Sequence, residues 1–454
     1  MLRGILCACL CLLLSAAAPP SDASGETAPS IAGRWNIVFV MPQGAYETPV
    51  EFVVGKGGSV AATILGPVGT FRITGTKGVA EGDKLRLTAS TSWGKLKLQG
   101  RVEGDRLRGR YAPAGLASLF FKGELRGLRD RAHAPRPALE TFDSAWSLIE
   151  SGFYAPDYGG IDVKGLRERY RPLAARARSE GELVSLMRRM LSEFRTSHLD
   201  FFATPSVTPE LHAGINQAPP PAPHGISWKH AAPSVGYLAI QSFEDGPEVV
   251  ARIDQAFAAL GGNGSLIVDL RGNGGGTLSA AMRLGDHILP RPMPVGYFAS
   301  RQGLIDRKLV SIDQLDRSAL PTFAGYSSEE LGRVMAGKGA LMLTSGGRAP
   351  RPYPGKIVLL IDEYCFSASE ALAGVVKETK AATLIGRKTP GLMLAANMIP
   401  IEGGWTLVLP VWDFRTPGGI KVEGRGVEPD IAVKFRNGRD ADLTAALRFL
   451  GARR

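Results

Sequence analysis

Cysteine is scarce in this chain, and its distribution limits both disulfide formation and metal binding. Three of the four cysteines, Cys7, Cys9 and Cys11, lie in an N-terminal apolar stretch, which leaves Cys365 alone in the rest of the chain. A single cysteine excludes an intramolecular disulfide and a thiolate zinc cage. The six histidines form no H-E-x-x-H pattern. We therefore expect no metal site and no cofactor.

Long apolar runs are also missing. The apolar stretch from Ile5 to Leu14 is too short to cross a bilayer, which needs about 20 residues. Arg3 precedes it and small residues at 21–23 follow it, so the pattern predicts a secretory signal peptide over residues 1–23. A lipoprotein signal at Cys7 or Cys9 is the alternative, but its apolar core would be shorter still. We expect export to the periplasm or the extracellular space.

Runs of one charge are absent although the formal net charge is +11. Lys and Arg are scattered, no run of five or more occurs, and few aromatic residues lie among them. This distribution does not indicate nucleic-acid binding. It predicts a basic solvated surface that favours acidic partners.

Residues 32–130 have the pattern of a closed antiparallel barrel. Short alternating segments are separated by glycine turns, and Gly33-Arg34-Trp35 is similar to the G-x-W that opens lipocalin-type barrels. Such a barrel either holds a small apolar ligand or is filled by its own side chains, and both alternatives stay open. The eight expected strands are 35–40, 51–54, 60–64, 70–75, 84–88, 95–102, 106–111 and 119–125.

A helical region is expected over residues 138–203, followed by a Pro-rich linker at 204–224. Apolar residues at helical spacing end at Phe194, and His198 comes just after them. A histidine between a serine and an aspartate is by itself more often a capping or surface residue than a base. His198 gains weight only in combination with other segments.

Ser367 lies where an apolar strand, Ile357 to Ile361, gives way to an Ala-rich helix at Ala371 to Val376. A serine at such a turn is held rigidly, and the free amides of the first helical turn can stabilise an oxyanion. Ser367 is therefore a candidate nucleophile. The alternative is that Ser367 or Ser369 only caps the helix.

A second candidate loop lies about a hundred residues upstream. The expected buried strand Ser265 to Arg271 runs into five residues, Gly272 to Gly276, that include four glycines. A phosphate-binding loop would need Lys-Ser/Thr after the glycines, and Thr277-Leu278 stands there instead. The loop can bring bare backbone amides against a substrate carbonyl.

Taken together, these segments resemble the S41 serine peptidases, the family of the carboxyl-terminal processing proteases and of the tricorn protease core. The resemblance spans roughly residues 137–440. It implies a crotonase-like α/β core at 225–440. Within that core, residues from about 293 to 354 have the pattern of an insertion that could form a lid or a substrate wall. The motifs that carry it are Thr196–Phe201, Val268–Gly276, Phe366–Glu370 and Glu423–Asp430.

Two kinds of base occur in this family. Processing proteases use a lysine after the nucleophile helix, but Leu392 stands at that position here, and Lys388 lies four residues too early. The tricorn-like branch uses a histidine after a serine, with a glutamate near the end of the domain. The residues that match are His198, Ser197 and Glu423.

The resemblance implies acyl transfer at a peptide bond. Ser367 would attack the carbonyl while His198 takes its proton, and Ser197 and Glu423 would orient the imidazole. The oxyanion hole would come from the amides of Ala368 and of Gly275 or Gly276. For Glu370 and Asp269 we expect supporting roles, as a helix cap and as an anchor of the glycine loop. Arg271 pairs with an internal acid or reaches a substrate carboxylate.

The sequence thus predicts an α/β multidomain serine endopeptidase that acts on exported proteins or peptides. The alternatives are a non-catalytic protein that binds a small apolar ligand and an envelope scaffold with a vestigial site. The joint presence of all four candidate catalytic side chains argues against both. Relatives often carry a PDZ module where this chain has its Pro-rich linker, which is too short to hold one.

Overall fold

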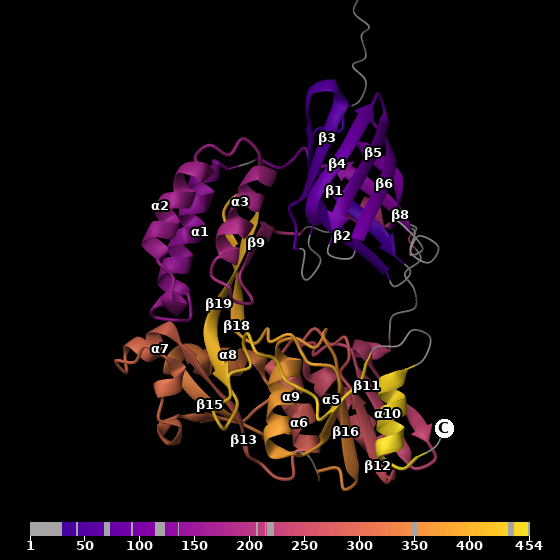
Figure 1. The fold of residues 1–454 in the computed structure, drawn as a ribbon, viewed down its shortest axis with the longest axis vertical. Coiled ribbons are helices and arrows are strands. Elements are labelled where there is room, and N and C mark those ends of the chain that lie inside the picture. The colour runs from indigo at the N-terminus through magenta and orange to yellow at the C-terminus, as the bar shows by residue number, and fades with distance from the viewer. Residues whose placement is uncertain are drawn as a thin grey trace, which may run out of the picture.

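The computed structural model describes residues 30–41, 44–67, 73–91, 94–113, 123–134, 136–205, 208–213, 215, 222–346, 352–434 and 440–452. The predicted signal peptide, residues 1–23, lies outside them. Figure 1 shows a barrel and a helical region side by side above an α/β core. The predicted fold class, an α/β core preceded by an antiparallel barrel and a small helical part, is confirmed.

Eight antiparallel strands close the N-terminal barrel, and each pairs with its neighbour in the chain. The short hairpins bring consecutive strands together, and closure removes exposed sheet edges. Three strands differ from the prediction: β2 begins earlier than expected, at Gly44, and β4 and β8 end later than expected, while the expected starts of β4 and β8, at 70 and 119, lie outside the described residues. The strands are β1 (Gly33–Met41), β2 (Gly44–Val54), β3 (Ser59–Ile64), β4 (Ile73–Glu81), β5 (Lys84–Thr91), β6 (Gly94–Glu103), β7 (Arg106–Pro113) and β8 (Gly123–Arg129).

The barrel interior is lined by apolar side chains that pack on one another. Trp35 is fully buried, donates from its indole Nε1 to the carbonyl of Ile31 at 2.8 Å, and lies under the guanidinium of Arg129. The alternation of buried and exposed residues along β5 to β7 matches the period of two expected of strands.

The helical region contains α1 (Ala138–Gly152), α2 (Val163–Ala174) and α3 (Glu180–Ser192). Their inner faces share one apolar core with the long hairpin of β18 (Ala395–Ile401) and β19 (Trp405–Arg415). The barrel docks on this region, since Arg34 pairs with Glu180 at 3.1 Å and the Gly181 amide donates to Glu51.

The core contains a six-stranded sheet in the order β10-β11-β12-β16-β17-β20, parallel except for β10 against β11. Its central strands are apolar on both faces because helices cover both. Helices α5 (Pro247–Leu260), α6 (Leu278–Ile288) and α9 (Ala368–Thr379) cover one face, and α10 (Ala441–Phe449) the other. The strands are β10 (Ile226–Ala232), β11 (Val235–Ile240), β12 (Ser265–Asp269), β16 (Lys356–Ile361), β17 (Thr383–Gly386) and β20 (Ile431–Ala432).

A second sheet corrects the view of residues 293–354 as an insertion. Its strand order is β14-β15-β13-β19-β18, so the segment supplies interior strands of the sheet. The pairing of β13 with β19 joins residues far apart in sequence, which no local pattern could reveal. The segment contains β13 (Pro294–Ser300), α7 (Arg301–Ile305), β14 (Thr322–Phe323), α8 (Ser328–Lys338) and β15 (Ala340–Thr344), and the side chain of Ser327 caps α8.

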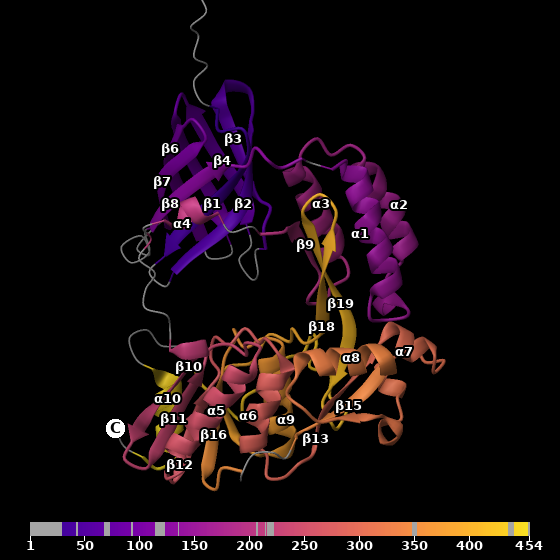
Figure 2. The ribbon, with the colours of Figure 1, turned by 180° about the vertical axis from the view of Figure 1, so that it is seen from behind.

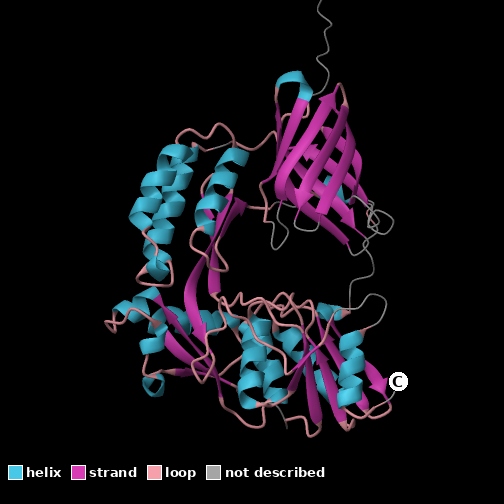
Figure 3. Cartoon of the chain, viewed as in Figure 1, coloured by secondary structure: helices cyan, strands magenta, loops and turns pink. Residues whose placement is uncertain are grey.

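The β18–β19 hairpin connects the core to the helical region. One end of β19 pairs with β13, and the other end pairs with β9 (Asp200–Ala203), the strand that follows His198. Figures 2 and 3 show the hairpin rising from the core to lie beside α3. This connection fixes the His198 segment relative to the α/β core. Within the described residues, no helix has the length and apolar content that a membrane span requires.

Candidate active site

Ser367 lies at the junction of β16 and α9 in a strained conformation. Its φ is 54° and its ψ is −118°, a combination that non-glycine residues rarely adopt. Such strain persists only where the surroundings enforce it, and it is typical of nucleophiles on strand-to-helix turns. Although Ser367 is the N-cap residue of α9, its side chain makes no capping hydrogen bond. The capping alternative therefore finds no support, and the hydroxyl stays available for chemistry.

Ser369 does not cap the helix either. It is fully buried, and its hydroxyl is within 2.7 Å of Oδ1 of Asn273 in the glycine loop. The Phe366 amide donates to the carbonyl of Asn273 at 3.1 Å. The nucleophile turn and the glycine loop are thus joined directly, as expected for loops at the carboxyl ends of adjacent parallel strands.

The glycine loop lies against Ser367. A Cβ atom on Gly275 would come within 2.8 Å of Cβ of Ser367 and 2.7 Å of the carbonyl oxygen of Phe366. Only glycine fits there, and the φ of Gly275 is 87°.

The structure narrows the expected choice of oxyanion donors. The Gly275 N–H is already engaged by Oδ1 of Asn273 at 2.8 Å, so Gly275 is not a free donor. Gly276 pairs with Phe243 in an isolated parallel β-bridge. The two hydrogen bonds of this bridge join Phe243 to the residues on either side of Gly276, so the N–H of Gly276 points away from Phe243. Within the described residues, the amides of Gly276 and Ala368 donate to no hydrogen-bond acceptor. These two amides remain as the candidate pair.

His198 is the second strained residue of the site. It lies between α3 and β9 with a φ of 55°. Its Nδ1 is 2.8 Å from Oγ of Ser197, and that hydroxyl is 2.7 Å from Oε2 of Glu423. The three residues predicted to form the base and its support are therefore brought together across 225 residues of sequence.

The direction of these hydrogen bonds determines which imidazole nitrogen is basic. Oε2 of Glu423 accepts from the Ser197 hydroxyl, and the Met393 amide donates to the same oxygen at 2.7 Å. Since the single hydroxyl proton of Ser197 is used on the carboxylate, Oγ can only accept from His198. Nδ1 therefore carries the proton, and Nε2 presents the lone pair that a general base needs.

Burial lowers the pKa of His198 below its ordinary value of 6.5. Desolvation disfavours the charged imidazolium, so the ring is held neutral at pH 7. The neutral form is the one that can remove a proton from a serine hydroxyl.

The segment 389–393 links the nucleophile to the histidine. The Ser367 amide donates to the carbonyl of Leu392 at 3.0 Å, while the next amide, that of Met393, binds Glu423. The described residues include no direct hydrogen bond between Ser367 and His198. Their relative position is fixed instead through the single peptide unit between Leu392 and Met393, whose C=O accepts from Ser367 and whose N–H binds Glu423.

Glu370 holds this segment in place. It is fully buried, and its carboxylate accepts from the hydroxyl of Thr389 at 2.6 Å and from the amides of Gly391 and Leu392. Burial raises its pKa. The expected capping role is therefore corrected, because these three bonds go to the neighbouring loop.

Lys388 lies at the surface, away from this set of contacts. Its Nζ pairs with Glu428 at 2.7 Å, and both side chains are more than half exposed. Leu392, which stands at the lysine position of the processing proteases, contributes only backbone atoms to the contacts described above. The geometry favours His198 over a lysine base.

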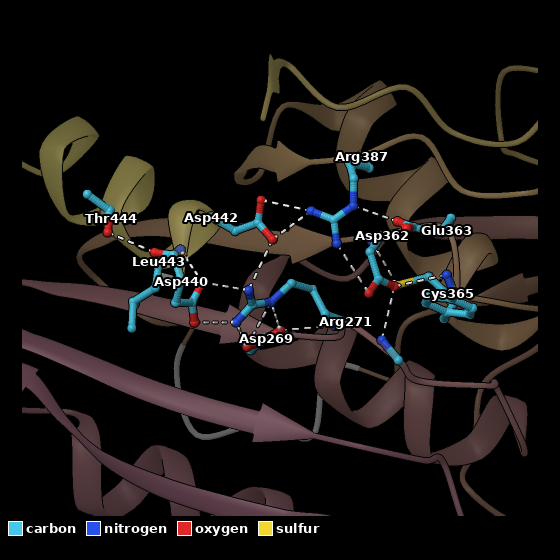
Figure 4. Close-up of polar contacts among 12 residues, drawn as sticks. Asp269, Arg271, Asp362, Glu363, Cys365, Arg387, Asp440, Asp442, Leu443 and Thr444 are labelled. Carbon is cyan, nitrogen blue, oxygen red and sulfur yellow. Dashed lines mark hydrogen bonds and ion pairs between the residues drawn. The ribbon is translucent and has the colours of Figure 1, made fainter. Parts of the chain in front are cut away.

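Arg271 belongs to an ion-pair network behind the loops, shown in Figure 4. Its guanidinium binds Asp269 at 2.6 Å, Asp440 at 2.7 Å and Asp442 at 3.0 Å. The expected pairing of Arg271 with an internal acid is thus confirmed. The side chain of Asp269 binds mainly Arg271, and not the glycines of the loop that we expected it to anchor. Arg387 bridges Asp442 to the nucleophile turn through Asp362 and Glu363.

Several supporting residues escaped sequence reasoning. Asn273 holds both Gly275 and Ser369, and Asp362 accepts from the Gly272 amide at 3.0 Å. Cys365 is buried, and its thiol donates to the carbonyl of Leu270. The one signal in the sequence for Asn273 was its position as a polar residue inside a run of glycines. The sequence held no signal for the role of Asp362, because the loop that it contacts lies ninety residues away.

Two family models match the chain. Residues 234–433 match the peptidase family S41, and residues 138–192 match the tricorn protease C1 domain. The first match contains Ser367, Glu423 and the glycine loop. The chain contains a peptidase family S41 domain. The matched range thus includes the six-stranded sheet except β10, the nucleophile turn and the second sheet described above, and the recognition made from the sequence motifs is confirmed.

Curated relatives of the S41 domain are processing proteases. The chain is 25% identical over 224 residues to the chloroplastic C-terminal processing peptidase of Tetradesmus obliquus, covering 49% of this chain and 40% of that protein. It is 27% identical over 206 residues to the carboxy-terminal processing protease CtpB of Bacillus subtilis, covering 44% of this chain and 34% of that protein. The chain thus spans well under half the length of these relatives.

The fold is also that of a solved structure. A putative peptidase from Parabacteroides merdae aligns with a TM-score of 0.51 at 18% identity, covering 70% of this chain and 98% of that one. At this identity the likeness shows the fold alone. It supports the α/β architecture of the S41 domain.

Proposed function

We propose that this protein is a serine peptidase that hydrolyses peptide bonds through an acyl-enzyme. The observation that carries the proposal is the hydrogen-bond chain from Glu423 through Ser197 to His198, which leaves Nε2 unprotonated, in a chain whose Ser367 occupies a strained strand-to-helix turn. A protein that only binds or scaffolds has no use for such a directed chain. The proposal is also supported by the processing proteases among the relatives.

In the proposed mechanism, Oγ of Ser367 attacks the carbonyl carbon of the scissile bond while Nε2 of His198 takes the hydroxyl proton. The amides of Ala368 and Gly276 stabilise the oxyanion. His198 then gives the proton to the leaving amine as the C–N bond breaks. Water, activated by the same imidazole, hydrolyses the ester and regenerates Ser367.

Ser197 and Glu423 act through His198. The carboxylate fixes the serine hydroxyl, and the hydroxyl fixes the Nδ1–H tautomer. When the imidazole becomes charged, the carboxylate stabilises it through the intervening hydroxyl, as the acid of a triad does directly. Ser197 and Glu423 are thus proposed as positioning residues.

The substrate proposed for this site is a protein or peptide met after export. Export rests on the predicted signal peptide at residues 1–23. Recognition of substrate C-termini is not part of the proposal, because the interval at 204–224 is too short for a PDZ module.

The proposal is tested by measuring hydrolysis of an unstructured protein substrate, such as casein, by four forms of the chain. The unmodified protein and Lys388→Ala are expected to be active, whereas Ser367→Ala and His198→Ala are expected to be inactive although folded. Lys388 is the matched control because it tests the lysine base directly. Activity in Ser367→Ala would refute the nucleophile, and loss only in Lys388→Ala would restore a lysine base.

A further inference from the structure

The outer face of the barrel gathers basic side chains on four neighbouring strands, β5 to β8. Along each strand the outward positions alternate with buried ones such as Leu85, Leu98 and Leu107. Seven of the positively charged side chains at these outward positions line one groove. They are Lys84, Arg86, Arg101, Arg106, Arg108, Arg110 and Arg126.

The strand register aligns four of these charges in one row. Lys84 is opposite Arg101, Arg101 is opposite Arg108, and Arg108 is opposite Arg126. The row has one cation on each of the four strands. Because adjacent strands lie about 4.8 Å apart, neighbouring positions in the row are separated by about that distance. Like charges directly opposite one another destabilise a sheet. A bound anion would relieve that repulsion.

Internal counter-charges are few. Arg101 pairs with Asp83 at 3.1 Å, and Arg126 approaches Glu124 at 4.0 Å while donating to the carbonyl of Ala213. In the described part of the chain, no carboxylate lies within 4.0 Å of four of the arginines. These are Arg86, Arg106, Arg108 and Arg110, and all four are exposed.

The row forms the floor of a groove of about 990 Å³. Residues of α4 (Pro209–His212) and the following Ala213 form its wall, and Figure 2 shows α4 lying against β8. The lining contains three glutamates, Glu103, Glu124 and Glu210, against the seven cations. An open groove with an excess of positive charge is better suited than a flat surface to bind an extended anionic chain.

The side chains indicate which anion. Six of the seven cations are arginines, whose planar guanidinium forks bind phosphate oxygens in pairs. The lining includes no aromatic residue on which nucleobases could stack. The exposed large apolar side chains of the barrel, such as Val53 and Val79, lie on β2 and β4 and not in the groove. Stacking of bases and insertion into a bilayer are therefore both disfavoured.

We propose that this groove, walled by α4 and floored by the Lys84–Arg101–Arg108–Arg126 row, binds a linear phosphate polymer that lacks bases. The absence of charge runs in the sequence does not conflict with this site, because the sheet collects cations that lie up to 42 positions apart. The site lies on the barrel and uses none of the residues proposed for peptide hydrolysis. Its test is therefore independent of the proposed function.

The test measures binding of fluorescently labelled inorganic polyphosphate to the full chain by anisotropy, at about 50 mM salt and again at about 200 mM. The variant Arg108→Gln/Arg110→Gln removes two unpaired guanidiniums from the groove. We expect about a tenfold weaker affinity and a smaller salt dependence in this variant, because fewer counterions are released. Thermal unfolding should be unchanged or slightly improved, since opposed like charges are removed.

The matched control is Arg176→Gln/Arg178→Gln, which removes the same charge from two exposed arginines of the helical region. It should bind polyphosphate as the unmodified chain does. Absence of binding to the unmodified chain, or equal loss in both double variants, would overturn the site. Tighter binding of poly-glutamate, of oligo-dT or of phosphatidylglycerol vesicles than of polyphosphate would overturn the ligand class, in favour of an acidic protein, a nucleic acid or a membrane surface respectively.

Discussion

At the scale of single residues, two residues with rarely populated backbone conformations define the candidate site. Ser367 and His198 both have a φ near 55°, and each is held there by a different set of hydrogen bonds. Strain of this kind costs about 1–3 kcal/mol per residue, which the surrounding contacts must offset. Such a cost is expected if Ser367 and His198 must be held in one fixed position relative to each other.

The histidine predicts a specific pH dependence. Because burial lowers the pKa of His198, the neutral base persists below pH 6.5 and is lost only as the pH falls through the lowered pKa. A profile of kcat/KM against pH should therefore show an acid limb with its midpoint below 6.5. A midpoint above 7 would contradict a buried imidazole base.

Removal of the Ser197 hydroxyl tests the tautomer argument. Ser197→Ala should reduce kcat about a hundredfold with little change in KM, because the ring loses the acceptor that keeps the proton on Nδ1. Ser197→Thr retains a hydroxyl and should recover much of the rate. If Ser197→Ala kept full activity, or if threonine failed to rescue it while the protein stayed folded, the positioning role would be wrong.

At the scale of elements, the site is an assembly of loop ends held by backbone contacts. The nucleophile turn follows β16, the glycine loop follows β12, and His198 precedes β9. The parallel pairing of β12 with β16 brings the first two loops to one edge, while β19 pairs with β9 and delivers the third. Each loop must keep its shape for the site to form.

The glycine loop offers a sharp comparison. Gly275→Ala would place a Cβ against Ser367 and the Phe366 carbonyl, so kcat/KM should fall about a hundredfold through displacement of the nucleophile. Gly272→Ala is the matched control, since its φ is also positive but its Cβ would meet nothing within 4 Å. Equal kinetics in the two variants would show that the close approach is unimportant.

The sequence allowed the fold class, the nucleophile turn and the serine-histidine-glutamate set to be predicted, because each depends on a local motif or on a family pattern. It did not reveal that β13 and β15 lie inside the second sheet, or that Glu370 holds the loop at Thr389. Both depend on pairings across long stretches of chain. The choice between Gly275 and Gly276 likewise required the side-chain position of Asn273.

At the scale of the whole molecule, three regions are joined by specific contacts. The barrel docks on the helices through Arg34 and Glu51, and the β18–β19 hairpin ties the helices to the core. The C-terminal helix α10 closes the core from behind, where Asp440 and Asp442 bind Arg271. The loops of the candidate site are thus supported from both sides of the sheet.

The Arg271 network should contribute measurably to stability. Arg271→Met leaves Asp269 and Asp442 buried without this partner, so we expect the free energy of unfolding to fall by about 3 kcal/mol. Arg101→Met removes a guanidinium from an exposed pair on the barrel and should change it by less than about 1 kcal/mol. Urea denaturation of the two variants measures both, and a smaller loss in Arg271→Met than in Arg101→Met would contradict the account.

The central claim is that His198 activates Ser367. The most direct measurement is intact-mass analysis after exposure to a fluorophosphonate, which reacts only with an activated serine, applied to the unmodified protein and to His198→Ala. We predict a single adduct that maps to Ser367 and is absent from the folded His198→Ala protein. An adduct on another serine, or equal labelling of both proteins, would contradict the claim.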